Sequence, residues 1–447
     1  MSQPTPAPLQ AQDSPVAAIA ARARKASRSL AQLSVETRNG ALLAIAGAIQ
    51  ANVPRILEAN ARDLKAAEPE VAAGRMSSAM FARLKVTERG VAQMAAQIRE
   101  VSRMEDPLGR RLSATELDEG LVLYKESCPF GVVGVIFESR PDALPQLASL
   151  ALKSGNAILL KGGAEAAHTN ETMVAVWRES LAKFPAVPAD SINLLQSRAD
   201  VNEMLALDRD VDLIIPRGSY ALVQFIMAHS RIPVLGHSEG VCHVYVDAAA
   251  DRDKAIAIAY DAKVQYPAVC NAAETLLVHQ AIAAKFLPSL AAKLKEAKVE
   301  IRGDAKTAAL LPGQGIVPAT EEDWRTEYSD LILSIKVVAD LAEAIDHINL
   351  YGSRHTDAIV TEDPEAARRF LSEVDSAGVF HNASTRFADG YRYGLGAEVG
   401  ISTSKLHARG PMGLEGLTTY KWKLLGSGHT VAPYAKGEKK FTHRPLP

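Results

Sequence analysis

From Pro129 onward, continuous apolar runs of strand length alternate with helical patterns, and this alternation constrains the fold most strongly. The first four runs are followed by helical periodicity and span residues 131–137, 157–161, 192–195 and 213–215. Strands that are apolar on both faces and joined by helices are typical of parallel sheets between helical layers. The pattern predicts a doubly wound α/β sheet, and we expect the run at 243–247 to close it.

A second α/β unit is expected from Asp251 onward. Its helical patterns span 253–265, 281–297, 340–350 and 364–372, and its apolar runs lie near 275–278, 299–301, 314–317, 332–337, 357–361 and 378–381. A chain of 447 residues is also too long for one compact core, so two domains agree with its length.

Before the first sheet, the chain has the patterns of helices and then of a hairpin. Capping residues and prolines predict five helices between Ser14 and Ser102, which form an all-helical layer. Residues 111–117 and 121–126 then alternate in polarity around an Asp-Glu-Gly turn, as β-hairpins do. Together with a strand-like run at 417–423, the hairpin is expected to form an arm.

Composition argues against several functional classes. Net charge is −2 and the basic residues are scattered, whereas a nucleic-acid surface needs a basic stripe. The three cysteines, Cys128, Cys242 and Cys270, lie far apart, which disfavours a disulfide framework or zinc cluster and favours a reduced, cytosolic setting. No run reaches ~18 apolar residues and the start of the chain lacks signal-peptide order, so neither a membrane helix nor a signal is predicted.

The strongest candidate for a reactive side chain is Cys270, in the stretch 265–274 between a predicted helix and a predicted buried strand. Loops held by a rigid scaffold often carry functional side chains. The alternative is a small buried hydrophobe, the usual role of a lone cysteine. Since a thiol with a pKa of about 8.5 is mostly protonated at neutral pH, a nucleophilic Cys270 needs nearby positive potential.

Polar side chains and glycines follow three of the first four strands. The segments are Glu138-Ser139-Arg140, Lys161-Gly162-Gly163 and Arg217-Gly218-Ser219. In open α/β sheets, ligands bind beyond the carboxyl ends of strands, where glycine turns and helix N-termini favour phosphate groups. We therefore expect a phosphate-bearing ligand at this edge, although the GxGxxG fingerprint is absent.

Longer motifs resemble the aldehyde dehydrogenase superfamily. Pro129–Ile136 is similar to the strand that opens its cofactor domain, Gly155–Lys161 to the next strand, and Tyr266–Glu274 to its nucleophile loop. Motifs at 137–142, 160–166, 215–219, 233–237, 382–390 and 407–411 resemble one branch, the γ-glutamyl phosphate reductase family.

This resemblance implies an aldehyde dehydrogenase-like fold of two doubly wound α/β domains with a β-hairpin oligomerisation arm. Residues 15–107 and 128–247 would form the NADP-binding domain and 248–410 the catalytic domain carrying Cys270. Residues 108–127 and 411–430 would form the oligomerisation arm of a homo-oligomer.

The implied reaction is the NADPH-dependent reduction of L-glutamyl 5-phosphate to L-glutamate 5-semialdehyde, the second step of proline biosynthesis from glutamate. Cys270 would form a thioester as phosphate departs, and Asn271 or Arg140 would stabilise the oxyanion. Hydrolytic relatives carry a water-activating glutamate in a segment that here reads 233–240, where no glutamate stands at the matching place. Its absence agrees with a thioester that must survive until hydride reaches it.

The resemblance also implies binding residues. Those for NADP(H) are Lys161, Gly162, Gly163, Arg217, Gly218, Ser219 and Glu327, and those for the substrate are Ser139, Arg386, Asp389 and Arg409. Ala164 replaces a glutamate of many NAD-preferring relatives and favours NADP, while Glu165 leaves NAD open. No metal is expected, since His237, His381 and His407 lack metal-ligand spacing and are interpreted as structural.

Two alternative functions remain open. A CoA-acylating aldehyde dehydrogenase would share the cysteine and the missing glutamate, and a non-catalytic scaffold would keep the fold alone. Association with glutamate 5-kinase, which makes the labile acyl phosphate, is plausible chemically.

Overall fold

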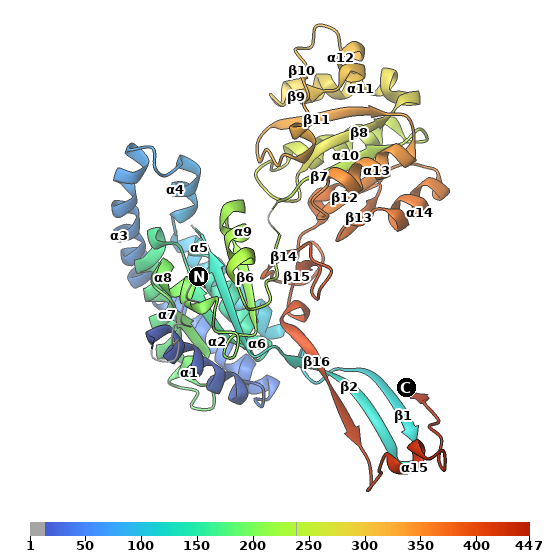
Figure 1. Ribbon diagram of the computed structural model, residues 1–447. Coiled ribbons are helices and arrows are strands. Elements are labelled where there is room, and N and C mark those ends of the chain that lie inside the picture. The colour runs from blue at the N-terminus through green and yellow to red at the C-terminus, as the bar shows by residue number, and fades with distance from the viewer. Residues whose placement is uncertain (1–13, 139, 238) are drawn as a thin grey trace, which may run out of the picture. The chain divides into compact units, whose positions relative to one another are not determined.

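The computed structural model describes residues 14–138, 140–237 and 239–447, which form two compact units (Figure 1). The first unit comprises the chain up to Leu235 together with Gly396–Gly400 and Met412–Pro447. The second comprises Gly236–Leu395 and Ile401–Pro411.

Five helices open the first unit, as predicted. They are α1 (Pro15–Leu30), α2 (Val35–Ala51), α3 (Val53–Ala72), α4 (Ser78–Leu84) and α5 (Glu88–Arg103). The side chains of Ser14, Ser34 and Thr87 accept backbone N–H groups in the first turns of α1, α2 and α5. Such caps satisfy donors that have no partner inside the helix, which explains why these starts are predictable.

The sheet of the first unit has four parallel strands in the order β5-β4-β3-β6. Its strands are β3 (Val132–Phe137), β4 (Ala157–Lys161), β5 (Ile192–Leu194) and β6 (Leu213–Arg217), and its connecting helices are α6 (Ala143–Lys153), α7 (Ala167–Leu181), α8 (Arg198–Met204) and α9 (Tyr220–His229). Every residue of β3 and β4 is buried, so both strands are continuous apolar runs, as predicted.

One strand prediction was wrong. The run expected to close the first sheet forms β7 (Cys242–Val246), which lies in the second sheet between β8 and β12. β7 pairs in parallel with both neighbours, and all five of its residues are buried. An apolar run shows that a strand is buried but not which sheet it enters.

The second unit contains a parallel sheet in the order β10-β9-β11-β8-β7-β12-β13. Its other strands are β8 (Ala273–His279), β9 (Glu300–Gly303), β10 (Val317–Pro318), β11 (Ile332–Val338), β12 (Thr356–Val360) and β13 (Gly378–His381). Its helices are α10 (Arg252–Val264), α11 (Gln280–Glu296), α12 (Ala305–Leu310), α13 (Leu341–Tyr351) and α14 (Pro364–Glu373). The predicted α/β alternation is confirmed, and only α12 was not predicted among these helices.

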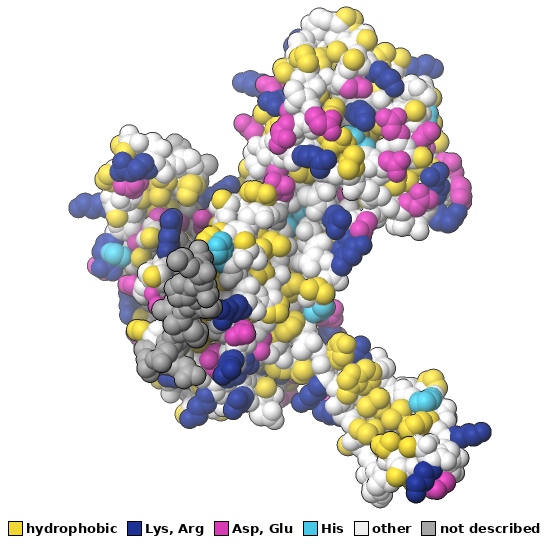
Figure 2. Space-filling view, viewed as in Figure 1, with side chains coloured by type: hydrophobic (Ala, Val, Ile, Leu, Met, Phe, Trp, Pro, Cys, Tyr) yellow, Lys and Arg dark blue, Asp and Glu magenta, His cyan; other side chains and the backbone are white. Residues whose placement is uncertain are grey.

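An antiparallel sheet in the order β16-β2-β1-β17 forms the arm of the first unit. It contains the predicted hairpin, β1 (Arg111–Asp118) and β2 (Leu121–Pro129), with β16 (Thr418–Leu425) and β17 (Arg444–Leu446), and α15 (Ala432–Ala435) lies in the connection. Hydrophobic side chains gather on the arm in Figure 2, and Trp422, Leu424 and Leu425 are exposed.

Short elements complete the chain. They are η1 (Ala164–Ala166), η2 (Ala189–Ser191), η3 (Glu322–Arg325), η4 (Thr385–Phe387), η5 (Glu415–Leu417), β14 (Gly400–Ser402) and β15 (Gly410–Met412). Among the described residues no single helix has both the length and the apolar composition to cross a membrane, and only α2 and α3 together, across a 66° bend, reach them.

Candidate active site

Cys270 lies on the loop between α10 and β8, and a buried ion pair joins the two elements that flank it. Lys263 Nζ, in the last turn of α10, lies 2.5 Å from Glu274 Oε2 at the start of β8, and neither side chain is exposed. Burial raises the pKa of the Glu274 carboxyl, and Lys263 opposes that rise. The pair therefore fixes both ends of the loop that carries Cys270.

The backbone of Cys270 is in close contact with Gly240. A Cβ atom at position 240 would lie 2.1 Å from the Cys270 carbonyl oxygen, so only glycine fits there. The same carbonyl accepts a hydrogen bond from the Cys242 thiol at 3.3 Å. The Gly240 N–H donates to Glu327 Oε2 at 2.9 Å, which links the predicted cofactor-binding glutamate to the Cys270 loop.

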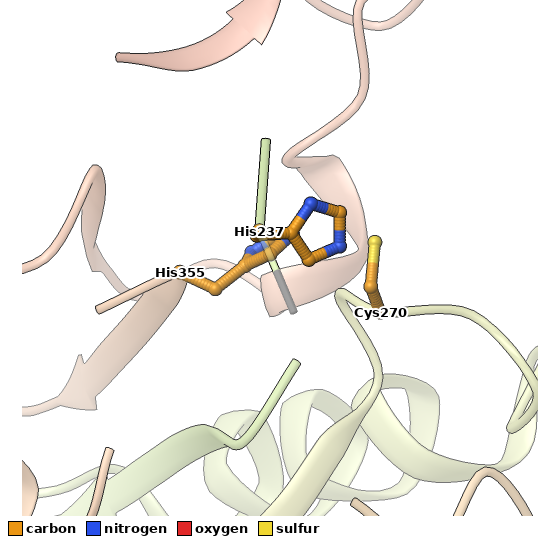
Figure 3. A group of neighbouring side chains, drawn as sticks. All are labelled: His237, Cys270 and His355. Atoms are coloured by element: carbon orange, nitrogen blue, oxygen red, sulfur yellow. The ribbon is translucent and has the colours of Figure 1, made fainter. Parts of the chain in front are cut away.

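Two imidazoles lie beside the Cys270 sulfur. One nitrogen of His237, one of His355 and Cys270 Sγ all lie within 4.8 Å of one another (Figure 3). His237 Nδ1 lies 3.0 Å from the Ile401 carbonyl, which can only accept, so the proton sits on Nδ1 and Nε2 carries the lone pair. The sequence pattern favoured a structural role for His237 and gave no signal for His355, because no short spacing relates either residue to Cys270.

Arg386, in η4, supplies positive potential to Cys270. Its side chain is buried, its Nε donates to Gln265 Oε1 at 2.9 Å, and its charge interacts with the Cys270 thiol. Burial lowers the pKa of Arg386, while Asp389 and Cys270 act in the opposite direction. The sequence predicted that such a cation is needed but did not identify it.

Asn271 is engaged in holding the loop. Its Nδ2 donates to the Ala388 carbonyl at 2.8 Å, and its own carbonyl accepts from Thr385 Oγ1 at 2.7 Å. Its Oδ1 is buried without a hydrogen-bond partner among the described residues. These bonds join the Cys270 loop to η4 and so position Arg386.

The two other predicted substrate-binding residues of the second unit already have partners. Asp389 Oδ1 accepts from the backbone N–H groups of Tyr391 and Arg392 at 3.0 and 3.2 Å. Arg409 donates to Asp375 Oδ1 at 3.1 Å. A glutamyl ligand would have to share or displace these bonds.

In the first unit, a cavity of about 670 Å³ lies beyond the carboxyl ends of β3 and β4. Its lining includes the predicted residues Lys161, Gly163 and Ser219, and also Glu165 and Arg198. Lys161 is buried, contacts the Gly162 carbonyl, and has its pKa lowered by burial. Arg198, a second cation in this cavity, was missed because it begins α8 rather than ending a strand.

The N-terminus of α9 is occupied by a carboxylate of the chain itself. Glu138 Oε2 accepts the Ser219 N–H at 2.8 Å, and a Cβ at Gly218 would lie 2.5 Å from the same oxygen. A phosphate group bound here would take the place of that carboxylate. Arg217 ends β6 in the same unit.

Arg140 lies in the first unit and Cys270 in the second. Arg140 is exposed and pairs with Asp142 at 3.0 Å. Ser139, predicted to bind substrate, lies outside the described residues.

Comparison with known proteins agrees with these features. The model of the aldehyde dehydrogenase family matches residues 7–310. The γ-glutamyl phosphate reductase of Synechococcus sp. (strain JA-3-3Ab) is 55% identical over 438 residues, covering 98% of this chain and 96% of the relative.

Two solved structures are similar to the chain. The crystal structure of γ-glutamyl phosphate reductase from Thermotoga maritima has a TM-score of 0.90 at 40% identity, covering 93% of this chain and all of that one. An acetylating aldehyde dehydrogenase from Geobacillus thermoglucosidasius has a TM-score of 0.62 at 16% identity, covering 93% of this chain and 97% of that one. At that identity the second match shows the fold alone.

Proposed function

The chain belongs to the aldehyde dehydrogenase family, in the branch of the γ-glutamyl phosphate reductases, and from this premise we propose its reductant, its intermediate and its pathway. It is an oxidoreductase that acts on glutamyl phosphate. We propose that NADPH is the reductant, that Cys270 carries the glutamyl group as a thioester, and that the product serves proline biosynthesis from glutamate. The observation that carries this proposal is the position of Cys270 on a loop that Lys263 and Glu274 fix at both ends and that Asn271 joins to η4, the element of Arg386.

Cys270 begins the reaction as a thiolate. Arg386 lowers the cost of forming it, because a positive charge nearby favours the charged form of a thiol. The sulfur forms a bond to the acyl carbon of glutamyl phosphate, and the bond from that carbon to the phosphate oxygen breaks. We assign the Cys270 backbone N–H, on the same residue as the sulfur, as a donor for the oxyanion.

When bound, NADPH supplies the hydride that converts the thioester to a thiohemiacetal. The Cys270 sulfur then leaves as thiolate, and the carbonyl of the semialdehyde forms. Water must not reach the thioester before this step, and the absence of a glutamate beside Val234 and Leu235 removes a base that would activate it.

The first-unit cavity is proposed to hold the cofactor. Its volume of about 670 Å³ lies within the range of cofactor sites, and Lys161 with Arg198 offers two cations for phosphate groups. Arg198 supports NADPH over NADH, since arginine suits a 2′-phosphate, while Glu165 in the same lining opposes it. Gly162, Arg217, Gly218 and Glu327 remain predictions for cofactor binding, as do Ser139, Asp389 and Arg409 for the substrate and Arg140 for the oxyanion.

The unit assignments follow from this proposal. The first unit would bind NADP(H), the second would carry out catalysis, and the arm with exposed Trp422, Leu424 and Leu425 would join copies in a homo-oligomer. Association with the kinase that makes the acyl phosphate is a further prediction.

The reverse reaction tests the proposal. With glutamate semialdehyde and NADP⁺, we expect more than one NADPH per chain to form only when phosphate is present, and Cys270→Ala to abolish NADPH formation. A requirement for CoA in place of phosphate would favour the acylating alternative, and undiminished activity in Cys270→Ala would overturn the assignment of the nucleophile.

A further inference from the structure

The group of Cys270, His237 and His355 has the composition of a metal site. One thiol and two imidazoles lie with their donor atoms within 4.8 Å of one another, although they come from three separate segments of the second unit (Figure 3). Thiolate and imidazole are the ligands of Zn²⁺, whereas Mg²⁺ and Ca²⁺ prefer oxygen. Three protein ligands with one open position is an arrangement that Zn²⁺ adopts in enzymes.

The two histidines are already oriented as metal ligands. His237 donates its Nδ1 proton to the Ile401 carbonyl, the second bond that metal-binding imidazoles usually make. Figure 3 shows a ring nitrogen of His237 facing the Cys270 sulfur.

His355 provides an independent observation. Its ring is 1% exposed, its Nδ1 lies 2.9 Å from Thr356 Oγ1, and its Nε2 is buried with no hydrogen-bond partner among the described residues. A buried polar atom without a partner is costly, so its persistence calls for a ligand or another compensation.

We propose that Cys270, His237 and His355 bind a soft divalent cation, with Zn²⁺ as the representative, and that its binding reversibly inhibits the enzyme. The inhibition rests on the proposed function of Cys270 as nucleophile, whereas the binding does not.

The chemistry of the site is balanced without a further reactant. Zn²⁺ forms one bond to sulfur and two to nitrogen, and the S–H bond breaks with release of one proton to solvent. Bond lengths of about 2.3 Å to sulfur and 2.0 Å to nitrogen place tetrahedral donors roughly 3.3–3.7 Å apart. The donors, now within 4.8 Å, need to approach by at most about 1.5 Å on that geometry.

Binding is measured first and without turnover, by titrating the full chain with Co²⁺. We expect a thiolate-to-cobalt charge-transfer absorption with one equivalent, displaced by Zn²⁺, and release of one proton per Zn²⁺ bound. Cys270→Ser should remove the absorption. His237→Gln should weaken Zn²⁺ binding by about 100-fold or more, since even residues that only hydrogen-bond to a metal ligand contribute about 10–100-fold to affinity. The matched control is His381→Gln, because His381 is exposed and lies outside the group.

His355→Gln should weaken Zn²⁺ binding by a similar factor. If this substitution at a buried position unfolds the chain, His237→Gln still tests the site. Zn²⁺ should also slow alkylation of Cys270 by iodoacetamide and inhibit turnover, with both effects reversed by a chelator. Equal Zn²⁺ affinity in the wild type and His237→Gln, or cobalt binding that persists in Cys270→Ser, would overturn the site. If Zn²⁺ binds as described but Cys270→Ala keeps full reductase activity, the metal site stands and the proposed function of Cys270 is refuted.

Discussion

Replacing Lys263 with methionine should destabilise the second unit and disturb the Cys270 loop. The substitution leaves the Glu274 carboxyl buried without its cation, because neither side chain of the pair is exposed. Removing one partner of a buried pair costs about 3–5 kcal/mol. For a domain of this size that corresponds to a lower Tm by roughly 6–20 °C.

The cost should depend on pH in a definite direction. Burial raises the pKa of Glu274, and without Lys263 only the weaker hydrogen bond from the Ser329 N–H opposes that rise, so the folded variant keeps the carboxyl protonated to higher pH. The unfolded chain releases that proton above its ordinary pKa of about 4.5. The variant should therefore lose about 1.4 kcal/mol of stability per pH unit as pH rises above that value. Because burial already raises the pKa of Glu274 to about 8 in the wild type, the wild type shares this slope up to about pH 8, and the extra loss in the variant appears above it.

The loss of stability is measured by urea unfolding and by hydrogen exchange of the β8 amides. The rate of Cys270 alkylation by iodoacetamide is the second readout. We expect slower alkylation in Lys263→Met, because the loop no longer holds the sulfur near Arg386. The double variant Lys263→Met with Glu274→Met should recover most of the stability, since apolar replacement of both partners is close to neutral. A loss below about 1 kcal/mol in the single variant, with unchanged alkylation, would refute the role of the pair.

Three further predictions concern the same unit. Gly240→Ala should lower the free energy of unfolding by about 1–3 kcal/mol and remove most reductase activity, because the new Cβ would lie 2.1 Å from the Cys270 carbonyl oxygen. The control is Gly47→Ala, whose Cβ would have no atom within 4 Å, and both variants are compared by thermal melting and by reductase assay. Arg386→Gln should slow alkylation of Cys270 by iodoacetamide at neutral pH, because it removes a positive charge that favours the thiolate, and an unchanged rate would remove Arg386 from thiolate stabilisation. Burial lowers the pKa of His347 to about 2, so below its ordinary pKa of 6.5 only the unfolded chain gains that proton and stability falls with falling pH. In His347→Gln, the free energy of unfolding measured with urea should fall less steeply between pH 6.5 and 5, by about 1.4 kcal/mol per pH unit. An unaltered slope would contradict the claim that folded His347 stays neutral in this range.

Much of the fold follows from local patterns in the sequence. β3 and β4 are predictable because both faces are buried, and α1, α2 and α5 because Ser14, Ser34 and Thr87 cap them. These signals lie within a few residues of the structure they predict. The predicted fold class, two α/β sheets with a hairpin arm, is confirmed by the observed sheets and by the family match.

The remaining features depend on pairing between distant segments. β17 has only three residues, Arg444–Leu446, and it forms because Ala114 pairs with Leu446 across the arm, which no periodicity predicts. β7 enters the second sheet for a similar reason.

At the candidate site, Cys270 was singled out from its loop and its resemblance, and Asn271 and Arg386 from the resemblance, but the approach of Arg386 and of two histidines to Cys270 was not predicted. His355 and Arg386 come close to it through tertiary packing of β12 and η4 against the loop. Their role in the site is therefore visible only in three dimensions.

The central claim is that the Cys270 sulfur carries the glutamyl group. Incubating the chain with glutamate semialdehyde and NADP⁺ but without phosphate, followed by acid quenching and mass spectrometry of its peptides, tests this directly. We predict a glutamyl adduct on the peptide containing Cys270, removed when phosphate is added. An adduct on another residue, or NADPH formation with no adduct at all, would contradict the account.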